Sequence, residues 1–288
     1  MKFFCTSAVF LTMSLLSLPL SAAEVWAYGV DQKSGWVDYD KEWKFGDPIW
    51  ADDAMCWAAS GSNVISWWQE LHASSLTSSV PRGAQVWDTF RYVFQNTGGV
   101  GSDAFEWWFY GTDMKWGGEL DKETAEAATA GQTYLFNGGF LNYLGAQNAV
   151  SFKYIEPDYT GCQSIVDILS QGCAITLSAT YGADGGGGHA ITLWGAEYKQ
   201  VDGKTLLTKV WLTDSDDKTK DLVDYDVVLK EGTNPGLTGD GSLNGYVLRS
   251  AAALNPHAYP VDVVPEPSSA MLCLLSLMGC VARRRRYC

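Results

Sequence analysis

The sequence predicts an α+β fold, in which a mostly helical first half packs against a mostly antiparallel β second half with a cleft between them. Two observations support this. Before about residue 160, apolar residues recur at helical spacing, and after it short alternating runs separated by turn signals replace them. A chain of 288 residues with 47% hydrophobic content can bury a sizeable core, so we expect one large domain between two short terminal segments.

The first predicted helix begins at Cys56, directly after the acidic pair Asp52 and Asp53. Apolar residues then recur at helical spacing: Ala58, Ala59, Val64, Ile65, Trp68 and Leu71. A thiol in the first turn of a helix is unusually acidic, because unpaired backbone N–H groups and the helix dipole stabilise the thiolate. A lone cysteine is more often a small buried core residue, so a catalytic role requires further support.

The remaining elements follow from periodicity and turn residues. Helical spacing continues from Pro81 to Gly111 with a glycine break at 98–101, and the composition over 119–145 is also helical. The second half predicts a short helix and then strands, with Asp202-Gly203 as a hairpin turn. These segments are Ser164–Leu169 for the helix and Ala174–Ala179, Ala190–Lys199, Leu206–Thr213, Asp224–Leu229 and Tyr246–Arg249 for the strands.

His189 has the most suggestive position of the three histidines. It follows the glycines 185–188, which we interpret as a mobile loop, and it opens a predicted strand. The neighbouring strand ends at Asp214, where a carboxylate can orient an imidazole. The 133 positions from Cys56 to His189 fall within the roughly 130 to 150 residue interval of papain-like enzymes.

Both termini resemble targeting signals. Lys2, the apolar run 8–20 and the small residues before Glu24 form a secretory signal peptide over residues 1–23. The other end has Pro265-Glu266-Pro267, a short apolar run and four arginines, and it resembles the bacterial PEP-CTERM sorting signal. That resemblance implies export from a Gram-negative-type bacterium, transient membrane association through the tail, and a sorting peptidase as partner. We therefore expect the folded domain over 24–258 and a linker with the sorting signal over 259–288.

Charge and cysteine content fit an exported protein. Processing would remove Lys2, four arginines and Glu266, which changes the formal charge from −13 to −17 and argues against a nucleic-acid partner. Of seven cysteines, Cys56, Cys162 and Cys173 would remain. Cys162 and Cys173 either form a disulfide, which leaves Cys56 free, or are separate core residues.

Four blocks in order resemble the IdeS or Mac family of streptococcal immunoglobulin-degrading cysteine endopeptidases, which have a papain-like fold. The blocks are Gly35-Trp36-Val37-Asp38-Tyr39-Asp40-Lys41, Asp52-Asp53-Ala54-Met55-Cys56 with Ala58-Ala59 and Trp67-Trp68, His189 to Ala196, and Thr213-Asp214-Ser215-Asp216. The resemblance implies a peptide-bond hydrolase with Cys56 as nucleophile, His189 as base and Asp214 as its orienting acid. It also implies that Asp216 is a second acid near the site and that Lys41 supports the oxyanion hole.

The chain departs from this family in two places. Residues 42–51 are longer than the family's segment between lysine and nucleophile, so Lys44 is an alternative to Lys41. Residues 75–160 show only loose similarity, so the family's immunoglobulin specificity is not carried over, and the expected substrate is a protein or peptide.

Other interpretations remain. The acids 214–217 could form a calcium loop, but Lys218 and Tyr225 occupy positions where an EF-hand requires ligands. The sequence otherwise predicts no metal and no cofactor. The same fold could also serve as a non-catalytic surface-binding module, and the same triad could transfer an acyl group to an amine.

Overall fold

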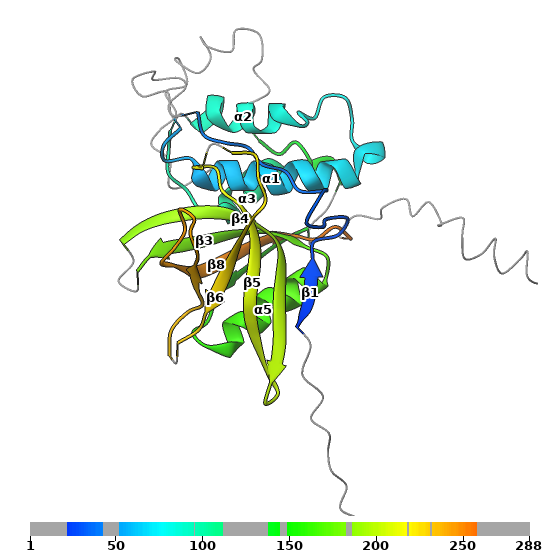
Figure 1. Cartoon of the computed structure of the whole chain (residues 1–288). Helices are drawn as coiled ribbons and strands as arrows, with labels where there is room; N and C mark the ends of the chain where they lie inside the picture. The colour runs from blue at the N-terminus through cyan, green and yellow to red at the C-terminus, as the bar shows by residue number, and fades with distance from the viewer. Residues whose placement is uncertain are drawn as a thin grey trace, which may run out of the picture.

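The computed structural model describes residues 22–42, 52–94, 96–111, 138–144, 149–182, 186–217, 219–230 and 232–257. The predicted sorting signal, most of the predicted signal peptide, Lys44 and most of the segment 119–145 lie outside these residues. Helices lie above a large sheet in the view of Figure 1, which confirms the α+β class. Within the described residues, no helix is both long enough and apolar enough to span a bilayer.

The helical layer consists of α1 (Cys56–Leu71), α2 (Ala84–Phe94) and α3 (Gly101–Tyr110), with short 3-10 turns at Ala73–Ser75 and Asn142–Leu144. These bounds confirm the helices predicted at Cys56 and between Pro81 and Gly111. Large aromatic side chains fill the layer's core and contact one another edge to face or stacked. They include Trp57, Trp68, Phe90, Trp107, Trp108 and Phe109.

Helix α1 is the central element, because it is buried on all sides from Trp57 to Gln69. The small residues in its first turns permit close packing. A Cβ atom added at Gly61 would lie 2.4 Å from the Cβ of Ala104 in α3, so only glycine allows the two helices to approach this closely.

The sheet is antiparallel and closes on itself. Its strands are β1 (Ala23–Trp26), β2 (Val150–Tyr154), β3 (Ala174–Tyr181), β4 (Gly186–Val201), β5 (Lys204–Thr213), β6 (Val223–Val228), β7 (Gly236–Thr238) and β8 (Tyr246–Leu254). Among the described residues, the order is β1-β4-β3-β8-β7-β6-β5, with β2 beside β8. Because β4 also pairs with β5, the six strands β4, β3, β8, β7, β6 and β5 form a closed ladder. This closure leaves few unpaired strand edges among the described residues.

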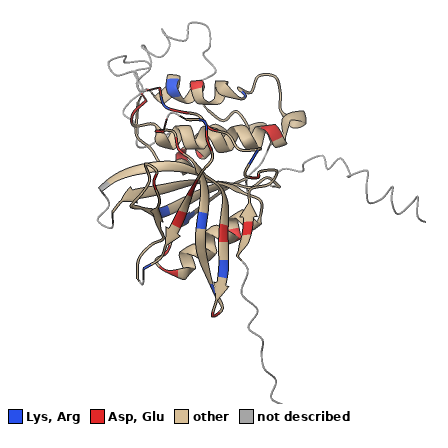
Figure 2. Cartoon of the chain, viewed as in Figure 1, with Lys and Arg blue, Asp and Glu red and all other residues tan. Residues whose placement is uncertain are grey.

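Helix α5 (Tyr159–Ser170) lies on the side of the sheet away from α1 (Figure 1). Asp158 caps its N-terminus by accepting from the backbone N–H of Thr160, which explains why it begins five residues before the predicted Ser164. Ile165 and Leu169 of this helix pack with Leu193 and Leu207 in a second apolar core. Figure 2 shows Lys and Arg interspersed with Asp and Glu over the strands in that view, without a basic stripe.

The structure corrects several details. The glycine run before His189 is not simply a loop, because β4 already begins at Gly186 and Gly188 pairs with Thr180 of β3. The strands β1, β2 and β7 were not predicted; they have three to five residues and show little alternation. Cys162 and Cys173 are both free and buried, so they are separate core residues instead of a disulfide.

Candidate active site

Cys56 and His189 meet where the first turn of α1 approaches the start of β4. Cys56 is partly buried, and its thiol lies close enough to the His189 ring and to the backbone N–H of Ala190 for both groups to affect its ionisation. Burial opposes ionisation of Cys56. Three neighbouring groups outweigh burial, so the pKa of Cys56 lies below its usual value. They are the His189 ring, the Ala190 N–H and the charge of Lys41.

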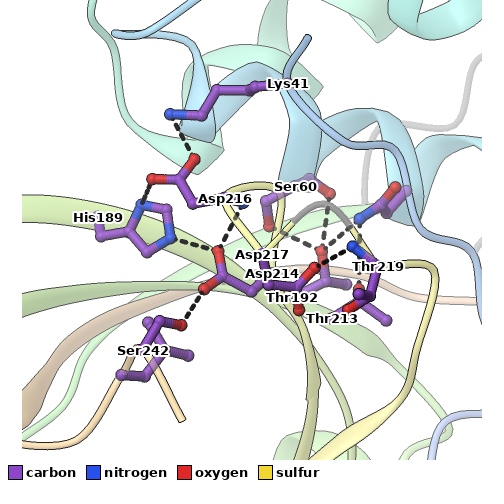
Figure 3. Close-up of polar contacts among 12 residues, drawn as sticks. Lys41, Ser60, His189, Thr192, Thr213, Asp214, Asp216, Asp217, Thr219 and Ser242 are labelled. Atoms are coloured by element: carbon purple, nitrogen blue, oxygen red, sulfur yellow. Dashed lines mark hydrogen bonds and ion pairs between the residues drawn. The ribbon is translucent and has the colours of Figure 1, made fainter. Parts of the chain in front are cut away.

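His189 is held from its other side by Asp214. His189 Nε2 lies 2.6 Å from Asp214 Oδ1, and Ser242 Oγ donates to Asp214 Oδ2 at 2.9 Å (Figure 3). Burial lowers the pKa of His189, but Asp214 and Cys56 outweigh it and raise that pKa to about 10. Burial likewise opposes ionisation of Asp214, and the partner His189 keeps its pKa below the usual range. The three groups together favour a thiolate, an imidazolium and a carboxylate.

Asp216 lies between His189 and Lys41 (Figure 3). Its Oδ2 is 3.9 Å from His189 Nδ1 and its Oδ1 is 2.5 Å from Lys41 Nζ, an ion-pair distance without the angles of a directed hydrogen bond. Lys41 is only 3% exposed, and its Nζ also donates to the carbonyl of Asp53 at 2.7 Å. The structure therefore brings all five predicted site residues into one cluster. The catalytic roles assigned to them remain predictions.

The lengthened segment after Lys41 is closed at its base. The backbone N–H of Glu42 donates to the buried carboxylate of Asp52 at 2.9 Å. Arg91 of α2 lies 3.5 Å from the same carboxylate and 3.4 Å from the Glu42 side chain. Because the two ends of the segment meet, its extra length does not displace Lys41 from Asp53. Lys44, the alternative to Lys41, lies outside the described residues.

Comparison with known proteins indicates a distant protease relative. The chain is 24% identical over 227 residues to an IgM protease from Streptococcus suis (strain P1/7), and the alignment covers 69% of this chain. The chain spans only 19% of the length of that protein. No family model matches the chain. The similarity supports a distant relationship to this IgM protease without assigning the narrower family.

Asn63 of α1 connects the elements that carry the site residues, and it was not among the residues predicted from the sequence. Its side-chain oxygen accepts from the N–H of Tyr39 at 2.8 Å, and its nitrogen donates to Thr192 Oγ1 at 3.0 Å and Thr213 Oγ1 at 3.4 Å. These partners lie on the Lys41 segment, on β4 and on β5. The available signal was an asparagine within a helix predicted to be buried, because a buried amide requires partners.

Within the described residues, two groups of side chains are compact enough to hold a metal ion. One is His189 with Asp214 and Asp216, whose contacts with Cys56 and Lys41 already account for it. The second is Asp38, Asp40 and Asp217, called here the Asp38 cluster. None of the contacts described above joins Asp38, Asp40 or Asp217 to Cys56 or His189. Acids 214–217 therefore do not act together as one loop site.

Proposed function

We propose that this chain is an exported cysteine endopeptidase with a papain-like fold, distantly related to the IdeS or Mac family. The observation that carries the proposal is the Cys56, His189 and Asp214 constellation, in which the pKa of the thiol is lowered and that of the imidazole is raised. A cysteine that only fills space in the core would not require a histidine and an aspartate beside it. The similarity to the IgM protease supports the same reaction class.

In the proposed mechanism, the Cys56 thiolate attacks the carbonyl carbon of a peptide bond. The backbone N–H of Cys56 and the positive charge of Lys41 stabilise the oxyanion that forms. His189 gives its proton to the leaving amine, and an acyl-enzyme remains on Cys56. His189 then takes a proton from water, which attacks the acyl-enzyme and releases the acid product. Asp214 orients the imidazole throughout, and Asp216 balances the charges of Lys41 and His189.

A groove that reaches the site through Tyr246 could bind part of a polypeptide substrate. Its volume is about 530 Å³, and Val228, Lys230, Leu237, Thr238, Tyr246 and Arg249 are among the residues that line it. Tyr246 connects the groove to the site, because its ring lies edge-on to that of His189 with centroids 6.1 Å apart. Lys230 and Arg249 favour substrates with acidic side chains in this groove. Cleavage of IgM is a property of the relative, and we assign no immunoglobulin substrate here.

The terminal segments support export. We propose a signal peptide over 1–23, a peptidase domain over 24–258, and a linker with a PEP-CTERM sorting signal over 259–288. A sorting peptidase would act on this tail after transient membrane association, and it would release the domain at or beyond the surface of a Gram-negative-type bacterium.

Thiol labelling followed by digestion tests the proposal. Iodoacetamide should modify Cys56 stoichiometrically at neutral pH, whereas Cys162 and Cys173 should stay unmodified because burial raises the pKa of both thiols. His189→Ala should abolish the rapid labelling. The wild-type domain should then cleave a peptide library, with Cys56→Ala as the inactive control. An inert Cys56 would reject the proposal.

Two other functions would give different results. A non-catalytic binding module would retain peptides without releasing fragments. An acyltransferase would yield products whose mass corresponds to an amine adduct instead of a free acid, because the same acyl-enzyme supports both reactions. Mass spectrometry of the digest, with and without an added amine, distinguishes these cases.

A further inference from the structure

The Asp38 cluster gathers three carboxylates from two distant parts of the chain. One oxygen each of Asp38, Asp40 and Asp217 lies within 4.8 Å of the others. Asp38 is only 6% exposed. Both of its carboxylate oxygens and Oδ1 of Asp40 are buried without a hydrogen-bond partner among the described residues. Buried carboxylates are normally paired or bound to a metal, so this arrangement indicates a ligand.

Among the described residues, little compensates for these negative charges; Lys218, next to Asp217, lies outside them. The N–H of Asp221 faces Asp38 without hydrogen-bond geometry, and exposed Lys220 is the cation near Asp40. Burial, followed by the charges of Asp40, Asp217 and Asp214, raises the pKa of Asp38 to about 8. A bound cation would offset both the burial and the repulsion.

The cluster lies on the two segments that carry Lys41 and Asp214. The backbone N–H of Lys41 donates to the carbonyl of Ser215 at 2.9 Å, and Thr213 Oγ1 donates to the carbonyl of Val37 at 3.3 Å. Figure 3 shows Asp216 directed at Lys41 and His189, whereas neighbouring Asp217 accepts from the N–H of Thr219. Asp216 therefore belongs to the candidate active site and Asp217 to the Asp38 cluster, although the two residues are adjacent in one loop.

We propose that Asp38, Asp40 and Asp217 bind one calcium-like divalent cation, which ties the Lys41 segment to the Asp214 loop. The described donors are carboxylate oxygens, which hard cations prefer, and an irregular set from two segments suits calcium better than magnesium. This site is discontinuous, so it differs from the single-loop calcium site that the EF-hand pattern argued against. It also departs from the sequence prediction of no metal, and it does not depend on peptidase activity.

Calorimetry and thermal unfolding of the EDTA-treated, desalted protein test the proposal directly. Calcium chloride should bind with a stoichiometry of one per chain. At about a hundredfold excess over Kd it should raise Tm by roughly 5 to 10 °C, as expected for a ligand specific to the folded state of a domain of this size. Magnesium chloride should bind more weakly. No heat of binding and no Tm shift with calcium would overturn the proposal.

Matched variants separate a ligand role from a folding role. Asp38→Asn and Asp217→Asn should each abolish the calcium-induced shift. In EDTA, Asp38→Asn should unfold at the same Tm as wild type or higher, because an amide is neutral at every pH and removes the cost of burying an unpartnered carboxyl group. Asp202→Asn is the control, since it makes the same charge change at the opposite end of the β4–β5 hairpin in a backbone conformation that asparagine tolerates. If Asp38→Asn and Asp217→Asn responded to calcium like wild type, the site would lie elsewhere and the proposal would be wrong.

Labelling of Cys56 in the same samples keeps the two proposals distinct. Calcium binding with an inert Cys56 would reject the peptidase and retain the cation site. A reactive Cys56 without calcium binding would retain the peptidase proposal and reject the cation site.

Discussion

Lys41 Nζ lies 2.5 Å from Asp216 Oδ1 in a pair whose lysine side chain is 2% exposed and whose aspartate side chain is 32% exposed. The other oxygen of Asp216 faces His189 Nδ1 at 3.9 Å. Asp216 thus pairs with Lys41 beside helix α1 and also lies near the His189 ring.

Replacing Lys41 with methionine should lower kcat by about 10²-fold with little change in KM, as for loss of an oxyanion stabiliser. The pKa of Cys56 should rise, because the charge of Lys41 helps to keep it low. Steady-state kinetics and the pH dependence of alkylation measure both effects. Lys153→Met on the exposed strand β2 is the control. An unchanged kcat in Lys41→Met would contradict the assigned role.

The wild-type pH profile should be bell-shaped. Activity requires the Cys56 thiolate with the His189 imidazolium, so the acid limb should fall below the usual pKa of a thiol, about 8.5. The alkaline limb should follow loss of the His189 proton near pH 10, given its pKa of about 10. We expect kcat/KM and the alkylation rate to show the same acid limb. A profile that rises only above pH 8.5 would contradict the activated pair.

Folding stability should depend on pH through the same groups. The raised pKa of His189 stabilises the fold fully below the unfolded value of 6.5, and this contribution is lost as pH rises through about 10. The lowered pKa of Asp214 stabilises the fold above 3.8, and this contribution is lost as pH falls through its folded value. Urea unfolding across pH, compared with His189→Gln, should show that the variant lacks the alkaline change.

Replacing Asp214 with asparagine should reduce kcat by about 10² to 10⁴-fold, because the imidazolium loses its charged partner. Ser242→Ala should have a milder effect, about fivefold, since it removes one hydrogen bond of about 1 kcal/mol to Asp214. Kinetics of both variants at several pH values test this order. Equal effects would indicate that Ser242 acts through something other than Asp214.

Asn63→Leu should destabilise the protein by about 2 to 4 kcal/mol, because it leaves the N–H of Tyr39 unpaired and removes hydrogen bonds to Thr192 and Thr213. The midpoint of urea unfolding measures this. Asn142→Leu, at an exposed position, should change stability by less than about 0.5 kcal/mol. If both substitutions had the same small effect, Asn63 would not be the junction that its contacts indicate.

Lys230→Glu should raise KM for peptides that carry acidic side chains and leave kcat nearly unchanged, because Lys230 lines the groove and lies apart from the reacting groups. The comparison requires paired acidic and basic peptides of the same length. Lys33→Glu, in the exposed turn near the N-terminus, makes the same charge change away from the groove. Identical KM values for the two peptides in wild type and Lys230→Glu would exclude substrate binding there.

Local signals were sufficient for the principal elements. The helix at Cys56, the hairpin at Asp202-Gly203 and the strands on either side of it appear as predicted, because periodicity and turn residues act over a few neighbours. The start of α5 was missed because an Asp158 cap, and not apolar spacing, determines it. The short strand β1 is stabilised by pairing with β4, which lies about 170 residues away in sequence, so no local pattern marks it.

The sequence by itself determined the α+β class, through periodicity and turn residues, and its resemblance to a known family supplied the five candidate site residues. Only the tertiary structure decided their neighbours. It brought Lys41 back to Asp53 across a lengthened segment, placed Asn63 among three elements, and divided the acids 214–217 between His189 and the Asp38 cluster. The physical reason is that burial and ion pairing depend on distance in space, and residues far apart in the chain become neighbours only through packing of α1 against the sheet.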